Sequence, residues 1–144
     1  MAAASSSATT VWDGGLAKGS GVTTPASGAF PATDVSWASR TARAAGKTSP
    51  EELLAAAHAA CYCMGLSHEL GEAGTPPGHL ECTATVDFVP GEGVKSSHLV
   101  VTGQVEGIDQ ETFAAAAAAA AEGCPISGAL KGNVEITVDA TLEG

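Results

Sequence analysis

Two cysteines far apart in the chain are the residues best placed to do chemistry. Cys61 lies midway along an apolar, helix-forming stretch, and Cys124 lies in Gly123-Cys124-Pro125-Ile126-Ser127 at a helix boundary. Folding can bring thiols that are so distant in sequence together. In a reducing compartment, cysteines that pair do so transiently, in catalysis or in sensing. The first hypothesis from the sequence is therefore a sulfur pair formed by Cys61 and Cys124.

The two thiols differ in their local chemistry. An ordinary thiol, with a pKa of about 8.5, is only slightly ionised at neutral pH, so a reactive one needs a cation, a helix amino end or a hydrogen bond. Cys61 lies mid-helix, where the helix field helps little. Cys124 precedes Pro125 and would cap a short helix running to Leu130, which favours its thiolate. Local physics alone makes Cys124 the better nucleophile, and each cysteine taken singly also fits a small buried hydrophobe.

The remaining sulfur and imidazole groups fit structural roles better. Cys82 falls on the inward face of an expected strand, which favours packing. Cys63 lies about 200° around the helix from Cys61, so the two cannot share a substrate or a metal. His58 shares a helix face with Cys61 and could be a metal ligand or a general base. Further ligands at close spacing are lacking, which favours packing or hydrogen bonding for His58.

Cys61 lies in a predicted helix that has clear start and stop signals. Ser49 can cap its amino end, Pro50 fits the first helical position, and Glu52 can reach back to complete a capping box. The apolar stripe continues for several turns, and Gly71 or Gly74 is expected to end the helix.

The other elements follow from periodicity and turn chemistry. Residues 80–89 and 134–142 alternate as strands with one exposed face, and residues 98–105 form a further strand. Asp109 is expected to cap an alanine-rich helix that ends near Glu122 and packs closely on a neighbour. Residues 1–8 are expected to fray, 11–15 and 19–24 to form a hairpin, and 28–46 to form a loop with an extended piece at 35–37. The pattern is α+β with a mainly antiparallel sheet.

Composition limits the partners. The chain has 144 residues and 44% apolar content, which fits one domain with its own core. Its net charge of −10 would repel a phosphate backbone, which argues against nucleic acid. No apolar run is long enough to span a membrane, and the first residues lack the basic and apolar regions of a secretory signal. We therefore expect a cytoplasmic protein with no membrane partner.

Three segments carry a resemblance to a known family. They are Thr48-Ser49-Pro50-Glu51-Glu52-Leu53-Leu54-Ala55-Ala56-Ala57-His58-Ala59-Ala60-Cys61, then Met64-Gly65-Leu66-Ser67, then Gly123-Cys124-Pro125-Ile126-Ser127 with Leu130-Lys131. From about Val11 onward the chain resembles the osmotically inducible protein C family (OsmC/Ohr peroxidases), and its osmotically inducible branch most. The resemblance implies one OsmC-like domain over residues 1–144, with mainly antiparallel sheets packed on two main helices. It also implies an intertwined homodimer and a thiol-dependent peroxidase.

The resemblance also implies roles for four residues. Cys61 becomes the peroxidatic thiol and Cys124 the resolving thiol, with Arg40 and Glu51 as the charged pair beside them. Cys61 would reduce an organic hydroperoxide to its alcohol and form a sulfenic acid, which Cys124 converts to a disulfide. An external lipoyl protein or small dithiol would then reduce that disulfide, with no metal or other cofactor. The family has an aromatic residue after its arginine, whereas this chain continues toward Arg43, so Arg40 is favoured over Arg43 without being fixed.

Helix geometry adds an expectation about assembly. Glu51 and Cys61 are ten residues apart on one helix, or about 15 Å, too far to touch the same peroxide. We therefore expect an obligate dimer in which Cys61 and Cys124 of one chain meet Glu51 of a partner, with Arg40 from either chain.

The apolar residues near the expected site also suggest a substrate class, and two other functions fit the same cysteines. An apolar active-site mouth is expected to favour alkyl or aryl hydroperoxides over hydrogen peroxide. Its expected lining is the alanine-rich helix together with Phe30, Trp37, Leu53 and Met64. One alternative is a redox-sensing or ligand-binding module that uses the same cysteine pair without turnover. Another is a structural metal site built from His58 and the cysteines.

Overall fold

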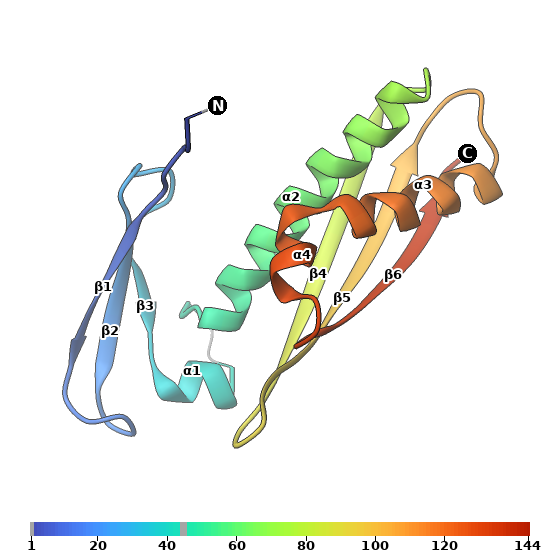
Figure 1. Cartoon of the computed structure of the whole chain (residues 1–144). Helices are drawn as coiled ribbons and strands as arrows, with labels where there is room; N and C mark the ends of the chain where they lie inside the picture. Colours follow the sequence, from blue (N-terminus) through green and yellow to red (C-terminus); the bar gives the residue numbers. More distant parts are fainter. Residues whose placement is uncertain (1, 44–45) are drawn as a thin grey trace. The chain divides into compact units, whose positions relative to one another are not determined.

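A computed structural model of the chain describes residues 2–43 and 46–144. The chain forms two compact units, Met1–Pro50 and Glu51–Gly144, each of which has its own sheet. Figure 1 labels their helices and strands.

The amino-terminal unit is a small antiparallel sheet followed by a short helix. Its strands β1 (Ala8–Asp13), β2 (Ser20–Pro25) and β3 (Thr33–Val35) pair in the order β1-β2-β3. The β1–β2 turn approaches itself so closely that a Cβ on Gly19 would lie 2.4 Å from the Gly15 carbonyl oxygen, which only glycine permits. The predicted hairpin is confirmed, with its first strand beginning at Ala8.

The loop predicted for residues 28–46 contains regular structure. Besides β3 it holds helix α1 (Trp37–Thr41). The extended piece expected at 35–37 is found at Val35 and Ser36, and Trp37 already belongs to the helix. The Ser36 hydroxyl accepts from the Ser39 N–H at 3.0 Å, and the Ser39 hydroxyl accepts from the Ser36 N–H at 3.0 Å. This capping box uses serine where the usual pattern has Glu or Gln, and for that reason the sequence pattern missed it. Residues 44 and 45 of the predicted loop lie outside the described residues.

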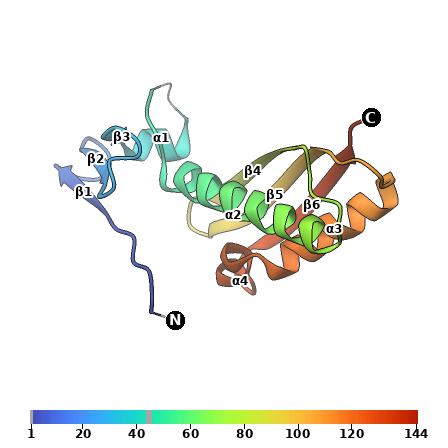
Figure 2. The same ribbon diagram turned by 90° about the horizontal axis from the view of Figure 1, so that it is seen from above.

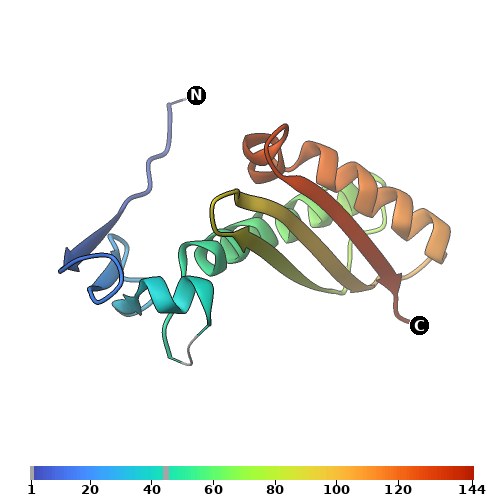
Figure 3. The same cartoon turned by 90° about the horizontal axis from the view of Figure 1, so that it is seen from below.

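The carboxy-terminal unit is a three-stranded sheet with helices. In chain order its elements are α2 (Pro50–Glu72), β4 (His79–Val89), β5 (Gly93–Gln104), α3 (Gln110–Gly123), α4 (Pro125–Leu130) and β6 (Glu135–Leu142). β4 pairs antiparallel with β5, and β6 pairs parallel with β5 because α3 and α4 carry the chain back across the sheet before β6 begins. Figure 2 shows α2 and α3 beside the sheet, and Figure 3 shows its three strands from below.

The predicted helix boundaries are confirmed. Helix α2 begins directly after Ser49 and runs unbroken to Glu72. Its last turn closes through the Thr75 N–H, which donates to the Leu70 carbonyl at 2.9 Å, while Gly74 takes a φ of +81°. Helix α3 is capped by Asp109, whose Oδ1 accepts from the Thr112 N–H at 2.8 Å.

Helices α2 and α3 share one core with the sheet. The alanine-rich α3 packs as predicted, since Ala117 and Ala120 are each 1% exposed. The Tyr62 hydroxyl donates to the Ala117 carbonyl at 2.8 Å and so joins α2 to α3. The main buried apolar residues of this core are Tyr62, Leu66, Leu70, Leu99, Val101, Phe113, Ala117 and Ala120. Neither α2 nor any other helix among residues 2–43 and 46–144 is long and apolar enough to cross a membrane.

Candidate redox site

The structure brings Cys61 and Cys124 together. Cys61 lies on α2, Cys124 lies between α3 and α4, and their thiols are in hydrogen-bonding contact. Cys61 and Cys124 are not joined by a disulfide bond. Cys124 is 1% exposed, whereas Cys61 is half-buried. The predicted sulfur pair therefore exists within one chain, and Cys61 is the member that solvent can reach.

A chain of hydrogen bonds ends on the Cys124 sulfur. The Ser127 hydroxyl donates to this sulfur. His58 Nε2 lies 2.8 Å from Ser127 Oγ, and His58 Nδ1 lies 2.6 Å from Ser97 Oγ. Because Ser127 uses its proton on Cys124, it must accept from Nε2–H, which leaves Nδ1 to accept from Ser97. Every donor in this chain therefore points toward Cys124 and stabilises negative charge there.

The amino end of α4 adds to this stabilisation. The N–H groups of Ile126 and Ser127 lower the pKa of Cys124, although the Cys124 side chain does not make a geometrically complete capping bond. The effect is thus the field of first-turn amides, which is what the position of Pro125 predicted.

The two thiols titrate as a pair. Burial raises the pKa of Cys124, but the donors from Ser127, Cys61 and Ile126 outweigh burial and lower it overall. Burial raises the pKa of Cys61, and although the Ile126 N–H lowers it, the neighbouring Cys124 raises it further. The first proton therefore leaves the pair easily and the second with difficulty, as expected for two acids that share a hydrogen bond.

This pairing predicts the pH dependence of thiolate formation. Thiolate absorbance in the reduced protein should show one thiolate appearing below the ordinary thiol pKa, because the first charge is stabilised by Ser127 and shared with Cys61. Ser127→Ala should move that first midpoint upward, since it removes a donor to the charged sulfur. A first midpoint above the ordinary thiol value, or one that Ser127→Ala leaves in place, would contradict this description of the pair.

The charged residues predicted for the site lie at the start of α2 and in the other unit. Glu51 lies in the first turn of α2 and is 6% exposed, and α2 is one unbroken helix, so Glu51 and Cys61 are about 15 Å apart along it. In the amino-terminal unit, the Arg40 guanidinium lies over the Trp37 ring, 5.9 Å from its centroid. Arg43 donates to the Ser39 carbonyl at 2.6 Å and has a φ of +40°. Arg43 thus stabilises its own loop.

His58 serves the hydrogen-bonding role that the sequence favoured. It is fully buried, both ring nitrogens contact serine hydroxyls, and burial lowers its pKa, so it stays neutral. Across the part of the chain that the structure describes, no group of three or more His, Cys, Asp or Glu side chains is arranged to hold a metal ion.

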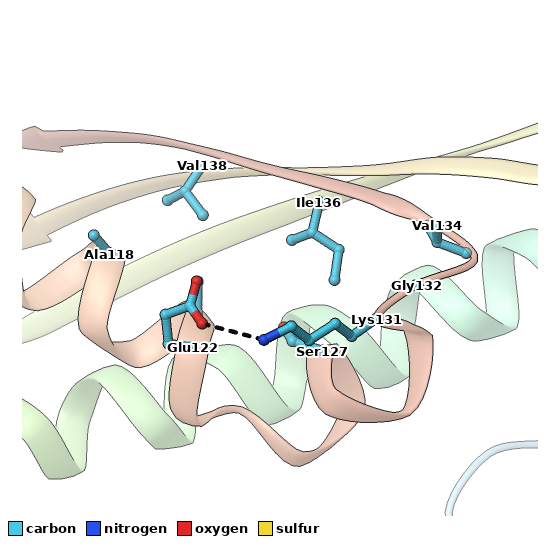
Figure 4. A pocket seen from close by; sticks show the side chains of 9 residues that line it. Ala118, Glu122, Ser127, Lys131, Gly132, Val134, Ile136 and Val138 are labelled. Carbon is cyan, nitrogen blue, oxygen red and sulfur yellow. Dashed lines mark ion pairs between the residues drawn. The ribbon is translucent and has the colours of Figure 1, made fainter.

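A hollow of about 450 Å³ lies next to this network, between α3, α4 and β6. Figure 4 shows Ile136 and Val138 on its strand side, facing Ser127 and the ion pair of Glu122 with Lys131, whose atoms are 3.8 Å apart. Because Ser127 lines the hollow and contacts Cys124, a molecule in the hollow would lie one side chain away from the thiol pair.

Sequence reasoning missed the serines of the site. Ser127 lies three residues after Cys124, at the position where an N-cap side chain reaches the helix backbone, which is a local signal for contact. Ser97 has no such signal, because its contact with His58 spans 39 residues and depends on how α2 packs on β5.

A half-buried thiol midway along α2, in contact with an enclosed thiol at the boundary between α3 and α4, is the arrangement of a thiol-based redox protein. Comparisons with known proteins support the same class of protein. A family model described as OsmC-like protein matches residues 43–139. Peroxiredoxin OsmC of Escherichia coli is 38% identical over 135 residues, which are 92% of this chain and 92% of that protein. The chain belongs to the OsmC/Ohr family.

Solved structures share the fold. The organic hydroperoxide resistance protein OhrB of Bacillus subtilis matches with a TM-score of 0.64 and 27% identity, over 94% of this chain and 98% of that one. A Legionella pneumophila structure described as organic hydroperoxide resistance protein OsmC matches with a TM-score of 0.72 and 24% identity, over 98% of this chain and 99% of that one. The predicted α+β fold of this family is therefore confirmed.

Proposed function

We propose that the chain is a thiol-dependent peroxidase that reduces organic hydroperoxides to alcohols. The observation that carries this proposal is the contact between the Cys61 and Cys124 thiols, with donors arranged to stabilise one negative charge on the pair. The names of its relatives, a peroxiredoxin and organic hydroperoxide resistance proteins, support the same class of reaction.

The exposure of the two cysteines supports Cys61 as the residue that reacts first. A peroxide can reach the half-buried Cys61 but not Cys124, which is 1% exposed. Cys61 gives its proton to the ionised Cys124 through their hydrogen bond and attacks the outer oxygen of the O–O bond. The O–O bond breaks, the inner oxygen leaves as alkoxide and takes up a proton, and Cys61 becomes a sulfenic acid. Two electrons have passed from sulfur to the peroxide.

Cys124 completes the cycle. Its thiol, already in contact with Cys61, attacks the sulfenic sulfur, so that an S–S bond forms and the sulfenic oxygen leaves as water. An external dithiol, such as a lipoyl protein or a small dithiol, then reduces the disulfide by exchange. Because the pair is in contact before oxidation, the sulfenic acid has a short lifetime and further oxidation is suppressed.

Arg40, held in place by Glu51, supplies the positive charge that the Cys61 thiolate needs. A buried thiol whose pKa is raised requires a cation to react at neutral pH, and a guanidinium can also donate to the departing oxygen. Glu51 would hold that guanidinium in a bidentate pair. The 15 Å between Glu51 and Cys61 on α2 makes a homodimer the natural solution, in which Glu51 comes from the partner. The net charge of −10 would repel a phosphate backbone, so we expect no nucleic-acid partner. We further propose a cytoplasmic location, where thiols are kept reduced.

Steady-state turnover tests this function. With dithiothreitol or a dihydrolipoyl reductant in excess, the purified chain should consume cumene hydroperoxide over many cycles. It should consume hydrogen peroxide more slowly, because the expected apolar mouth of Phe30, Trp37, Leu53 and Met64 binds the aryl group. A single oxidation event without turnover would favour a redox sensor instead, and a faster reaction with hydrogen peroxide would contradict the substrate class.

A further inference from the structure

The two cysteines outside the redox site also contact each other. Cys63 on α2 and Cys82 on β4 are in side-chain hydrogen-bonding contact, in which the Cys82 thiol and the Cys82 backbone N–H both donate to the Cys63 sulfur. All four cysteines of the chain thus form two contacting pairs. The second pair was not anticipated, because Cys63 and Cys82 each fit packing when considered alone.

The position of the second pair leaves it reachable. Cys63 and Cys82 are both half-buried, and β4 is an edge strand of its sheet. Cys82 packs at the margin of the core, on the same strand face as Leu80 and Ala84. A small oxidant can therefore approach this pair, whereas Cys124 is enclosed.

The two pairs are separate but close. Cys61 and Cys63 point about 200° apart on α2, so their sulfurs cannot meet without unwinding the helix. Even so, a charge on Cys124 raises the pKa of Cys82, and charges on Cys63, Cys82 and Cys124 all raise the pKa of Tyr62. The buried Tyr62 side chain therefore lies near Cys124 of the first pair and near both cysteines of the second.

We propose that Cys63 and Cys82 are a second redox pair, which closes to a disulfide when organic hydroperoxide exceeds what Cys61 and Cys124 consume. The Cys63 sulfur, which accepts two hydrogen bonds, attacks the outer peroxide oxygen. The O–O bond breaks, and the inner oxygen takes up the proton that the Cys63 thiol loses and leaves as an alcohol. The Cys63 sulfenic sulfur is then attacked by the Cys82 thiol, which forms the S–S bond and releases water. Two thiols and one hydroperoxide thus give one disulfide, one alcohol and one water.

The second pair reacts more slowly than the first. Burial raises the pKa of Cys63 and raises that of Cys82 to about 12, so neither carries a stabilised thiolate such as the one that Ser127 supports at Cys124. Its disulfide would tie α2 to β4 and close a loop of the 18 residues between the two cysteines. The product is thus a protein that is both oxidised and more rigid.

The decisive experiment uses the full chain with Cys61→Ser and Cys124→Ser together. This double variant lacks the proposed peroxidase cycle, so its outcome does not depend on that function. The reduced variant is treated with excess cumene hydroperoxide or with diamide, free thiols are alkylated, and peptides are mapped without reduction. We expect a Cys63–Cys82 disulfide with both oxidants, and a thermal midpoint raised by about 5–10 °C relative to the reduced form.

Controls make every outcome decisive. Adding Cys63→Ala to the double variant should abolish the thermal shift, and Cys82→Ala alone should leave hydroperoxide turnover unchanged. Wild-type protein with a large excess of hydroperoxide should show both disulfides, which covers the case in which the double variant folds poorly. Cys63 and Cys82 that stay alkylatable, a disulfide formed by diamide only, or separate sulfinic acids on the two residues would each overturn the proposal.

Discussion

Cys61→Ser should abolish hydroperoxide turnover, with a loss of more than about 1,000-fold. A serine hydroxyl keeps the size of the thiol but cannot take up oxygen as a sulfenic acid, so no covalent intermediate forms. The measurement is consumption of cumene hydroperoxide with dithiothreitol, at equal folded protein by circular dichroism.

Cys124→Ser is the matched control, because it separates attack from resolution. This variant should reduce one equivalent of hydroperoxide and stop at a Cys61 sulfenic acid, which dimedone would trap. The opposite pattern, with Cys124→Ser inert toward peroxide and Cys61→Ser oxidised once, would reverse the two roles. That reversal would mean that the low pKa of Cys124 outweighs the exposure of Cys61.

Arg40→Met should lower the rate of Cys61 oxidation by about 100- to 1,000-fold, with little effect on folding. The guanidinium is proposed to stabilise the Cys61 thiolate and to donate to the leaving oxygen, and loss of one such donor typically costs this much. Stopped-flow oxidation of the reduced protein measures the step directly. Arg43→Met is the matched control, since Arg43 donates to the Ser39 carbonyl, and it should leave the rate within about threefold.

Mixing two inactive variants tests which chain supplies Arg40. If Arg40 acts across a dimer interface, Cys61→Ser and Arg40→Met chains that exchange subunits should regain about a quarter of the wild-type activity, because half the dimers then hold one complete site. If Arg40 acts within its own chain, no activity should return. Full activity in a monomeric protein would contradict the dimer altogether.

Local signals predicted most of the fold. Ser49 and Pro50 marked the start of α2, Asp109 marked the start of α3, and Pro125 marked α4, because each acts on backbone groups within one turn. The alternation of apolar and polar residues predicted the ends of β4 and β6 to within one residue of their observed positions. Helix α1 was not predicted, because its capping box uses Ser39 in place of an acidic residue.

The site was predictable only in part, since its contacts are long-range. The positions of Cys61 and Cys124 relative to the predicted helices suggested a pair, and the resemblance to a known family implied the role of each. Folding places the two thiols in contact. The link from Ser97 through His58 to Ser127 depends on how α2, β5 and α4 pack, which no local spacing encodes. The contact between Cys63 and Cys82 was not predicted either, since it also depends on packing between distant elements. Helix geometry shows only that Cys63 cannot reach Cys61.

The central claim is that Cys61 and Cys124 form one reactive pair, and peptide mapping after a single equivalent of oxidant tests it most directly. Reduced wild-type protein is mixed with one equivalent of cumene hydroperoxide, quenched with an alkylating reagent and digested without reduction. We predict one cross-linked peptide joining Cys61 to Cys124, with Cys63 and Cys82 alkylated. A cross-link between any other cysteines, or a Cys61 sulfinic acid beside an alkylated Cys124, would contradict the claim.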